Sequence, residues 1–441
     1  MVRLLIVADD FTGALDTGVH FSERGIPTRV TVSLKDDGAW TEALYSEQTE
    51  VLVIDAETRH ISPKEAYHRV YEIVAEGKKA GVSYIYKKTD SALRGNIGAE
   101  LEAAYRASGV SVFPFIPALP DMNRITRNGI QYIDGIPNSK SVFGQDPFEP
   151  VTEDAVKDVI HLQSDLPVRE ATDVEHVLWE EPGILVFDAA TNADLQTIGK
   201  MLIASGRGTL LAGCAGLASI LPDLLGLKTS AMPETVLEKK LFVLCGSVNP
   251  ITKAQLSYGE KMGYPRVRLT PEQKLNPQLW RSGKERQLPR SISELLKTQD
   301  CVMLDSNDVC QTAETSAGQE EKSGTREGSH SGTASETLVL AAERNLDIQQ
   351  VRQRISETLG IALKQIVEEG IDAVILVTGG DTLLGFMEEV GLWELSPIRE
   401  IRPGCVLTRL MYRGREYHII TKSGGFGQET LLAELARELA E

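Results

Sequence analysis

Short apolar segments that end in polar or glycine-containing turns recur along this chain. Residues 3–8, 51–54 and 82–86 are such segments in the first half, and each is followed by a stretch with helical features. Short unbroken apolar runs are typical of buried strands. Strands that alternate with helices favour a mostly parallel sheet with helices on both of its faces. The sequence therefore predicts an α/β fold.

The alternation stops once and then resumes. Residues 228–239 have no periodicity and contain Pro233, which indicates a linker, and a further apolar run follows at 240–245. A chain of 441 residues is long enough for two or three domains. We therefore expect two α/β domains, at residues 1–230 and 238–441, with a cleft between them. Residues 311–336 are rich in Gly, Ser, Thr and Glu, and this composition predicts a flexible polar insertion in the second domain.

Charge and cysteine content exclude several classes of protein. The net charge is −17, which argues against nucleic acid or an anionic membrane as a partner. The five cysteines form no CxxC pair, and their odd number argues against a zinc site or a disulfide framework. Reduced thiols fit a cytoplasmic location. No apolar run approaches the ~18 residues of a membrane span. We expect small-molecule ligands, and the sequence is compatible with a homodimer.

The turn after residues 82–86 carries the densest group of functional side chains. Lys88, Thr89, Asp90, Ser91 and Arg94 lie between this strand and a helical pattern. In an open α/β sheet such a turn lies at the carboxyl edge, where ligands bind, and the free N–H groups of the helix start suit an anion. Asp90 would repel an anion, unless the ligand also has hydroxyl groups to donate. The alternative is an ordinary turn with a solvated charge cluster.

Two other strand ends in the first half add to this group. Asp10 follows the strand at 3–8, and Arg59 follows the strand at 51–54. Arg59, Lys88 and Arg94 offer positive charge for a carboxylate, which an arginine can bind with two parallel hydrogen bonds. Asp10 and Asp90 offer acceptors for hydroxyl groups. The pattern predicts a site for a small hydroxylated anion.

The second half has three glycine-containing turns that each follow a strand and precede a helix. Glycine there lets the backbone approach a phosphate, and exposed N–H groups can surround it. Neither a P-loop nor a GxGxxG motif is present. Asp381 could hold Mg²⁺ or act as a base. The alternative is that the glycines only form tight turns. The residues in question are Ser247, then Gly379, Gly380, Asp381 and Thr382, and finally Lys422, Ser423, Gly424, Gly425, Phe426 and Gly427.

Four separated signatures together resemble the four-carbon acid sugar kinase family. They are residues 8–14 with Asp16, residues 88–91 with 93–96, residues 379–382 and residues 422–427, in the order of the family. The resemblance covers most of the chain outside 311–336. It implies an ATP-dependent kinase that phosphorylates a sugar acid such as threonate, erythronate or a 3-oxo-tetronate. Its first domain would bind the acid and its second the nucleotide. Ala92 is a departure, because many relatives have threonine there.

The resemblance also implies roles for individual residues. Asp10, Arg59 and residues 88–91 would bind the acid, while Ser247, Gly380 and residues 423–426 would bind ATP. Phosphoryl transfer depends mainly on positioning and charge stabilisation. Asp10, Asp90 and Asp381 all qualify as the base that accepts the hydroxyl proton, so the choice among them stays open.

Three alternatives fit less of the sequence. A phosphatase of the haloacid dehalogenase type needs DxDxT, whereas residues 9–12 read Asp-Asp-Phe-Thr. A nucleotide-dependent dehydrogenase needs a glycine fingerprint that is absent. A non-catalytic sugar-acid sensor would keep the first site but would not require the glycine turns.

Overall fold

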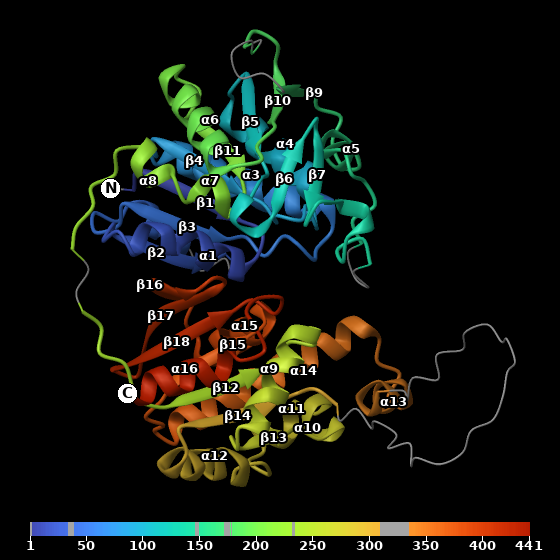
Figure 1. Ribbon diagram of the computed structural model, residues 1–441, viewed down its shortest axis with the longest axis vertical. Coiled ribbons are helices and arrows are strands. Elements are labelled where there is room, and N and C mark those ends of the chain that lie inside the picture. The colour runs from blue at the N-terminus through green and yellow to red at the C-terminus, as the bar shows by residue number, and fades with distance from the viewer. Residues whose placement is uncertain are drawn as a thin grey trace, which may run out of the picture. The chain divides into compact units, whose positions relative to one another are not determined.

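The computed structural model describes residues 2–33, 39–145, 150–171, 177, 179–231, 234–308 and 335–441. The chain forms two compact units, residues 1–236 with 393–421 and residues 237–392 with 422–441 (Figure 1). Strands and helices alternate in both, which confirms the α/β class. Residues 393–421 belong to the first unit although they follow most of the second in sequence. Of the predicted insertion, residues 311–334 lie outside the described residues.

The first unit has a mostly parallel sheet in the order β18-β17-β16-β2-β3-β1-β4-β11-β5-β10-β9. All residues of β1 and β3 are buried, as their unbroken apolar sequences require. Only β16 and β17 add antiparallel pairings among the printed registers of this sheet. The strands are β1 (Leu4–Ala8), β2 (Thr28–Val32), β3 (Val51–Asp55), β4 (Tyr84–Lys88), β5 (Val112–Ile116), β9 (Val168–Ala171), β10 (Gly183–Phe187), β11 (Leu210–Gly213), β16 (Glu394–Arg402), β17 (Cys405–Tyr412) and β18 (Arg415–Lys422).

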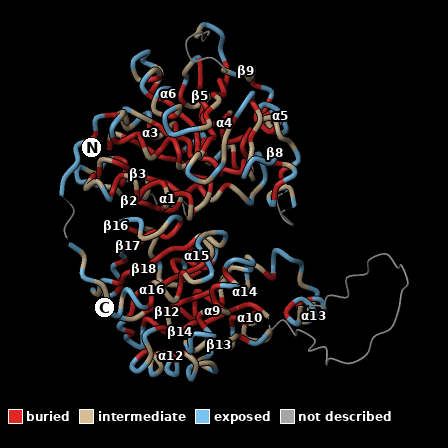
Figure 2. Tube along the Cα trace, in the orientation of Figure 1, coloured by how far each residue is buried: buried red, intermediate tan, exposed pale blue. Residues whose placement is uncertain are grey.

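Helices cover both faces of this sheet. Leu5 and Val7 of β1 share a core cluster with Val70 and Leu101, which lie on helices at one face. The helix after β1 instead contacts β2 and β3 from the other side. The buried residues concentrate along the strands in Figure 2. The helices are α1 (Phe11–Ser22), α2 (Ala39–Leu44), α3 (Pro63–Lys79), α4 (Ile97–Ser108), α5 (Val156–His161), α6 (Asn192–Ala204), α7 (Ala215–Ala218) and α8 (Leu221–Leu224).

Three local features of this unit follow from its sequence. Ser62 and Glu65 form a capping box at the start of α3. An excursion from the main sheet forms a three-stranded antiparallel sheet of β6 (Arg124–Arg127), β7 (Ile130–Ile133) and β8 (Ile136–Pro137). Asn128 and Asp134 adopt positive φ angles in its two turns. β5 continues through Pro114 to Ile116, because the Pro-Phe-Ile sequence is apolar enough to stay buried between two neighbouring strands.

The second unit has a parallel run of strands in the order β13-β14-β12-β15. These are β12 (Leu241–Cys245), β13 (Arg266–Arg268), β14 (Cys301–Asp305) and β15 (Val374–Thr378). Its helices are α9 (Pro250–Lys261), α10 (Pro271–Leu275), α11 (Pro277–Arg281), α12 (Gln287–Thr298), α13 (Glu336–Glu343), α14 (Ile348–Glu368), α15 (Gly380–Val390) and α16 (Leu431–Ala440). Within the described residues, no helix of either unit combines the length and apolar character needed to cross a membrane.

Candidate functional sites

The first unit has a topological switch point between β1 and β4. The chain leaves β1 through α1 to reach β2 on one side, and leaves β4 through α4 to reach β5 on the other. Open α/β sheets bind ligands beyond the carboxyl ends of the strands at such a point. The residues that follow these two strands are Asp9 and Asp10 after β1, and Thr89 and Asp90 after β4. The switch point therefore coincides with the predicted acid site.

Arg59 links the carboxylates at this point. Its Nε and Nη2 donate to one oxygen of Asp9 at 2.8 and 2.6 Å, and its Nη1 donates to Asp10 at 2.7 Å. Its Nη2 also lies 3.5 Å from Asp90 Oδ1. Asp10 is in addition the N-cap of α1, because its Oδ1 accepts the N–H of Gly13 at 2.9 Å. Arg59 therefore holds three acidic side chains in one arrangement.

Asp90 organises the loop between β4 and α4. Its carboxylate accepts the N–H groups of Ala92 and Arg94 at 3.1 and 3.2 Å, and the Arg94 guanidinium donates to both of its oxygens at 2.9 Å. Burial opposes ionisation, but Arg94 and Arg59 outweigh it and hold the pKa of Asp90 well below its usual range. Gly95 has φ +83°, and a Cβ there would come within 3.0 Å of Arg59 Cγ. The loop thus needs glycine where it meets Arg59.

The two consecutive lysines at the end of β4 have different environments. Lys87 is fully buried and its Nζ lies 2.7 Å from Glu100 Oε2. Lys88 points to the other face, where its Nζ donates to the carbonyl of Thr89 at 2.8 Å. A Cβ on Gly13 would come within 2.9 Å of this ammonium. Within the described residues, no carboxylate lies within 4 Å of Lys88, although its exposed fraction is only 5%. Lys88 thus brings to the switch point a positive charge that no carboxylate of the described residues contacts directly.

The small sheet of β6, β7 and β8 also reaches this loop. Arg124 Nη1 donates to Ser91 Oγ, Gln131 Nε2 donates to the carbonyl of Ser91 at 3.1 Å, and Asn138 Nδ2 donates to the carbonyl of Ala92 at 2.6 Å. The Phe143 ring lies 5.1 Å from the Arg124 guanidinium carbon and 5.0 Å from that of Arg94. Arg124, Gln131, Asn138 and Phe143 were not predicted as site residues. The Asn-Gly and Asp-Gly pairs at 128–129 and 134–135 mark the turns of the small sheet in the sequence, but they carry no signal of its packing on this loop.

The predicted acid-site residues therefore lie in one place. Asp10, Arg59, Asp90 and Arg94 form one network of ion pairs, and Lys88, Thr89 and Ser91 belong to the same loop. Thr89 is fully buried, and its Oγ1 has no hydrogen-bond partner among the residues that the structure describes. Asp9 was quoted within the first signature without a role in the site, yet it is the closest ion-pair partner of Arg59.

The second unit has its own switch point, between β12 and β15. The chain leaves β12 through α9 towards β13, whereas it reaches β15 on the opposite side of β12. A Cβ on Gly246 would lie 1.9 Å from Thr382 Oγ1, and a Cβ on Gly424 would lie 2.5 Å from Ser247 Oγ. Thr252 Oγ1 donates to the carbonyl of Gly424 at 2.8 Å. The three glycine turns thus meet, and the close contacts require glycine at 246 and 424.

The turn from Ser423 to Gly427 is held by groups from α9 and from its own start. Lys422 Nζ donates to the carbonyl of Ser423 at 2.9 Å and to Thr252 Oγ1 at 3.3 Å, and the residue is only 1% exposed. Gln255 Nε2 donates to the carbonyl of Phe426 at 3.0 Å. Lys422 was predicted as part of a turn that approaches a phosphate. In the structure its ammonium lies beneath the turn and binds the turn's own oxygens.

Asp381 and Asp305 lie at the ends of β15 and β14, the two strands that flank β12 in the sheet. Asp381 lies in the first turn of α15, and its side chain is 50% exposed and paired with Arg352 at 2.9 Å. Asp305 ends β14, is fully buried, and is bound by Arg266 at 2.5 Å and by the Asn307 side chain at 2.7 Å. Asn307 Nδ2 lies 3.1 Å from the carbonyl of Ser247. The sequence analysis did not identify Asp305 or Asn307, because no glycine follows this strand.

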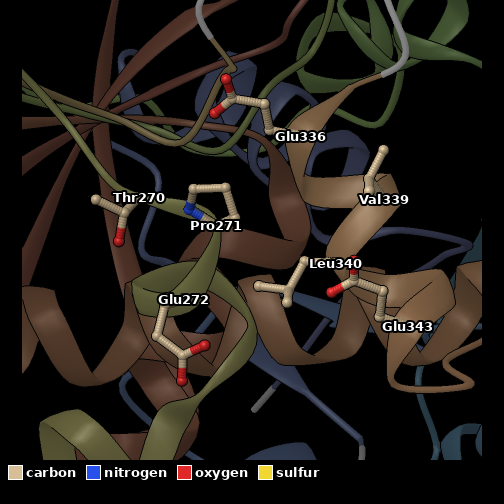
Figure 3. A pocket seen from close by; sticks show the side chains of 7 residues that line it. All are labelled: Thr270, Pro271, Glu272, Glu336, Val339, Leu340 and Glu343. Carbon is tan, nitrogen blue, oxygen red and sulfur yellow. The ribbon is translucent and has the colours of Figure 1, made fainter.

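A pocket elsewhere in the second unit does not suit a nucleotide phosphate. It has a volume of about 410 Å³ and is shown in Figure 3. Its acidic lining would repel a phosphate, and the Arg344 guanidinium that contacts Glu272 is already bound to that carboxylate. The lining residues are Thr270, Pro271, Glu272, Glu336, Val339, Leu340 and Glu343.

Comparison with known proteins assigns each unit to a described type of domain. A model described as a sugar-binding N-terminal domain matches residues 4–221, and one described as a nucleotide-binding C-terminal domain matches residues 242–432. The chain belongs to the four-carbon acid sugar kinase family. Within the family, the D-threonate kinase of Salmonella typhimurium is 27% identical over 98% of this chain and 97% of its own length.

Other relatives in the family differ in the substrate that they are named for. The D-erythronate kinase of Heliobacterium modesticaldum is 27% identical over 97% of this chain and 94% of its own length. The 3-oxo-tetronate kinase of Methylobacterium radiotolerans is 24% identical over 96% of this chain and 95% of its own length. A solved protein of Salmonella typhimurium LT2 matches the fold with a TM-score of 0.75 and 21% identity, over 99% of this chain and 100% of its own. A Haemophilus influenzae protein matches with a TM-score of 0.69 and 20% identity.

Proposed function

We propose that this protein is an ATP-dependent kinase that transfers a phosphoryl group to a hydroxyl of a four-carbon sugar acid. The observation that carries the proposal is the charge arrangement at the first switch point. The buried Lys88 ammonium lacks a carboxylate partner within 4 Å in the described part of the chain, and it lies beside the Asp10, Asp90 and Arg59 network. A ligand with both a carboxylate and hydroxyl groups satisfies the cation and the acidic acceptors together. The named activities of the relatives support this substrate class.

Asp10 is the best placed of the acidic residues to accept the hydroxyl proton. Its side chain is 23% exposed, against 3% for Asp9 and 8% for Asp90. Asp90 is a weak base, because its pKa is held well below the usual range by Arg94 and Arg59 against the effect of burial. In the transfer, the substrate oxygen bonds to the γ-phosphorus, the bond from that phosphorus to the β-phosphate oxygen breaks, and ADP leaves. Asp10 takes the proton as the new bond forms.

The glycine turns of the second unit are the proposed nucleotide site. The turns at Ser247, Gly379–Thr382 and Ser423–Gly427 meet at a switch point, as phosphate-binding turns do in open sheets. Asp381 would supply one carboxylate to Mg²⁺, since this metal in kinase sites takes most of its other ligands from phosphates and water. The metal would supply neutralisation of charge on the transferred phosphate. Asp381 is exposed enough for this role but would exchange its pairing with Arg352.

A coupled ADP-release assay tests the proposal. The full chain is assayed with ATP, Mg²⁺ and D-threonate, D-erythronate or a 3-oxo-tetronate, and with threitol and erythritol as uncharged comparisons. We expect one acid to stimulate ADP release and the polyols to be much poorer, because losing a charge-assisted hydrogen bond costs about 1.5–3 kcal/mol. Equal rates with acid and polyol would contradict an acid-specific kinase. Binding of acid without ADP release would favour a sensor.

A further inference from the structure

The arginines of the acid site differ in what they bind. Arg59 donates hydrogen bonds through Nε, Nη1 and Nη2 to Asp9 and Asp10, and Arg94 donates to both oxygens of Asp90. Their charges are therefore neutralised within the protein. A substrate carboxylate at either of them would have to compete with an aspartate that is already in contact. Neither Arg59 nor Arg94 is therefore available to form the main ion pair with the carboxylate of a substrate.

Arg124 is the exception. Its Nη1 donates to the neutral hydroxyl of Ser91, and no carboxylate lies within 4 Å of its guanidinium in the described ranges of the chain. Its Nε and Nη2 make no hydrogen bond with the described residues, and together they form an edge that suits a carboxylate. The residue is partly exposed, so a ligand can reach it. Burial lowers the pKa of the Arg124 guanidinium, as expected for a cation that lacks a close counter-ion.

The surroundings of Arg124 fix its position. Its guanidinium carbon lies 5.1 Å from the centre of the Phe143 ring, in cation–π range, and the same ring faces Arg94. Gln131 and Asn138 bind the backbone of Ser91 and Ala92 at 3.1 and 2.6 Å. The small sheet is thereby attached to the loop that carries Lys88 and Asp90. A guanidinium held in this way costs little further ordering when it binds a ligand.

The geometry points to Arg124 as the residue that recognises the substrate carboxylate, together with Lys88, while Arg59 and Arg94 position the aspartates. This inference rests on the proposed acid substrate, and it adds a residue on the β6 strand that determines specificity for acid over polyol. Phe143 and Ser91 then act by holding the guanidinium.

The test measures acid binding and turnover separately in the full-length protein. Binding of D-threonate, D-erythronate, threitol and erythritol is measured by calorimetry without ATP, and ADP release is measured with the acid that binds best. The variants are Arg124→Gln and Arg124→Lys. The matched control is Arg127→Gln, because Arg127 lies on the same strand and is exposed. Thermal melting shows which variants are folded. If Arg124→Gln does not fold, the acid binding of Arg124→Lys decides the test.

We expect Arg124→Gln to weaken acid binding roughly tenfold to a hundredfold, as for the loss of a hydrogen bond to a charged group. Polyol binding and the KM for ATP should stay unchanged. Arg124→Lys should recover part of the acid preference, since it keeps the charge but not the planar edge. Wild-type acid binding in Arg124→Gln, or equal losses for acid and polyol, would overturn the inference.

Failure of the kinase proposal gives a different result. A wild-type protein that binds an acid without releasing ADP overturns the kinase activity, and the binding comparison of the Arg124 variants still decides the inference. A wild-type protein that binds none of these acids overturns both.

Discussion

Arg59 donates to a single oxygen of Asp9 through both Nε and Nη2, at 2.8 and 2.6 Å. Its remaining terminal nitrogen donates to Asp10 at 2.7 Å. This relationship makes Arg59 an organiser of the acidic groups at the end of β1. It also explains why Arg59 follows β3, the strand that neighbours β1 in the sheet.

Arg59→Lys should impair use of the acid and leave the KM for ATP nearly unchanged. An ammonium cannot reproduce the planar fork that holds Asp9 and Asp10 together, so Asp10 would lose its fixed position. The kinetics of ADP release as a function of acid concentration measure the effect. Arg106→Lys is the control, because Arg106 is a half-exposed arginine on α4 whose pairing with Glu102 is on the surface. A change confined to ATP would show that the sites are assigned to the wrong units.

Replacement of residues 309–334 by a short Gly/Ser link should leave the fold and activity nearly intact. The composition of this segment cannot bury enough apolar surface to offset chain ordering. Asp308 joins its two ends, since it accepts hydrogen bonds from Ser335 Oγ, from Thr337 N at 3.1 Å and from Thr337 Oγ1 at 2.5 Å. Lys274 also binds Asp308. The melting temperature and kcat of the shortened chain are the measurements.

Asp308 provides a control for the loop replacement. Asp308→Asn in the full chain removes the charge that faces the buried Lys274, and it should lower the melting temperature more than the loop replacement does. A shortened chain that melts much earlier, or loses most of its kcat, would show that residues 309–334 stabilise or assist the second unit.

Much of the fold was predictable from sequence because its signals are local. The apolar run of β1 and the polar residues after it are neighbours in sequence, and the same holds for β4 and β15. The pairing of β16 with β2 joins residues about four-fifths of the chain apart, such as Thr31 and Glu394, and no local pattern encodes it. The contacts of Asp9 and Arg124 depend on side-chain packing between distant segments, so only the structure reveals them.

Asp16 should make stability depend on pH between about pH 4 and pH 7. Burial raises the pKa of Asp16 to about 7, against the opposing effect of Lys88, so the folded protein binds this proton more tightly than the unfolded chain. The resulting contribution to stability is full below the unfolded pKa of about 3.9 and is lost as pH rises towards 7. Asp16→Asn should remove this dependence. Denaturant unfolding at several pH values from 4 to 8 checks it, and identical pH slopes in both proteins would contradict it.

Gly425→Ala should weaken ATP binding without destabilising the protein. A Cβ at this position would meet only Asn249 Nδ2, at 3.7 Å, whereas a Cβ at Gly424 would collide with Ser247 Oγ at 2.5 Å. The protein therefore has room for an alanine methyl group at 425. A phosphate that approaches the turn would collide with that methyl group. We expect Gly425→Ala to raise the KM for ATP and to leave the melting temperature unchanged. Gly424→Ala should raise the KM for ATP and also lower the melting temperature. Normal ATP kinetics in Gly425→Ala would remove this turn from the proposed nucleotide site.

Lys422→Met separates two ways in which a lysine can serve a phosphate site. A lysine that touches the transferred phosphate lowers kcat when it is removed and has less effect on ATP binding. Lys422 is instead buried beneath the turn, where its ammonium donates to the Ser423 carbonyl and to Thr252 Oγ1. Its loss leaves these groups without their donor, so the turn should become less ordered. We expect Lys422→Met to raise the KM for ATP and lower the melting temperature together. A fall in kcat alone, in a protein of normal stability, would show that the ammonium moves to the phosphate during transfer.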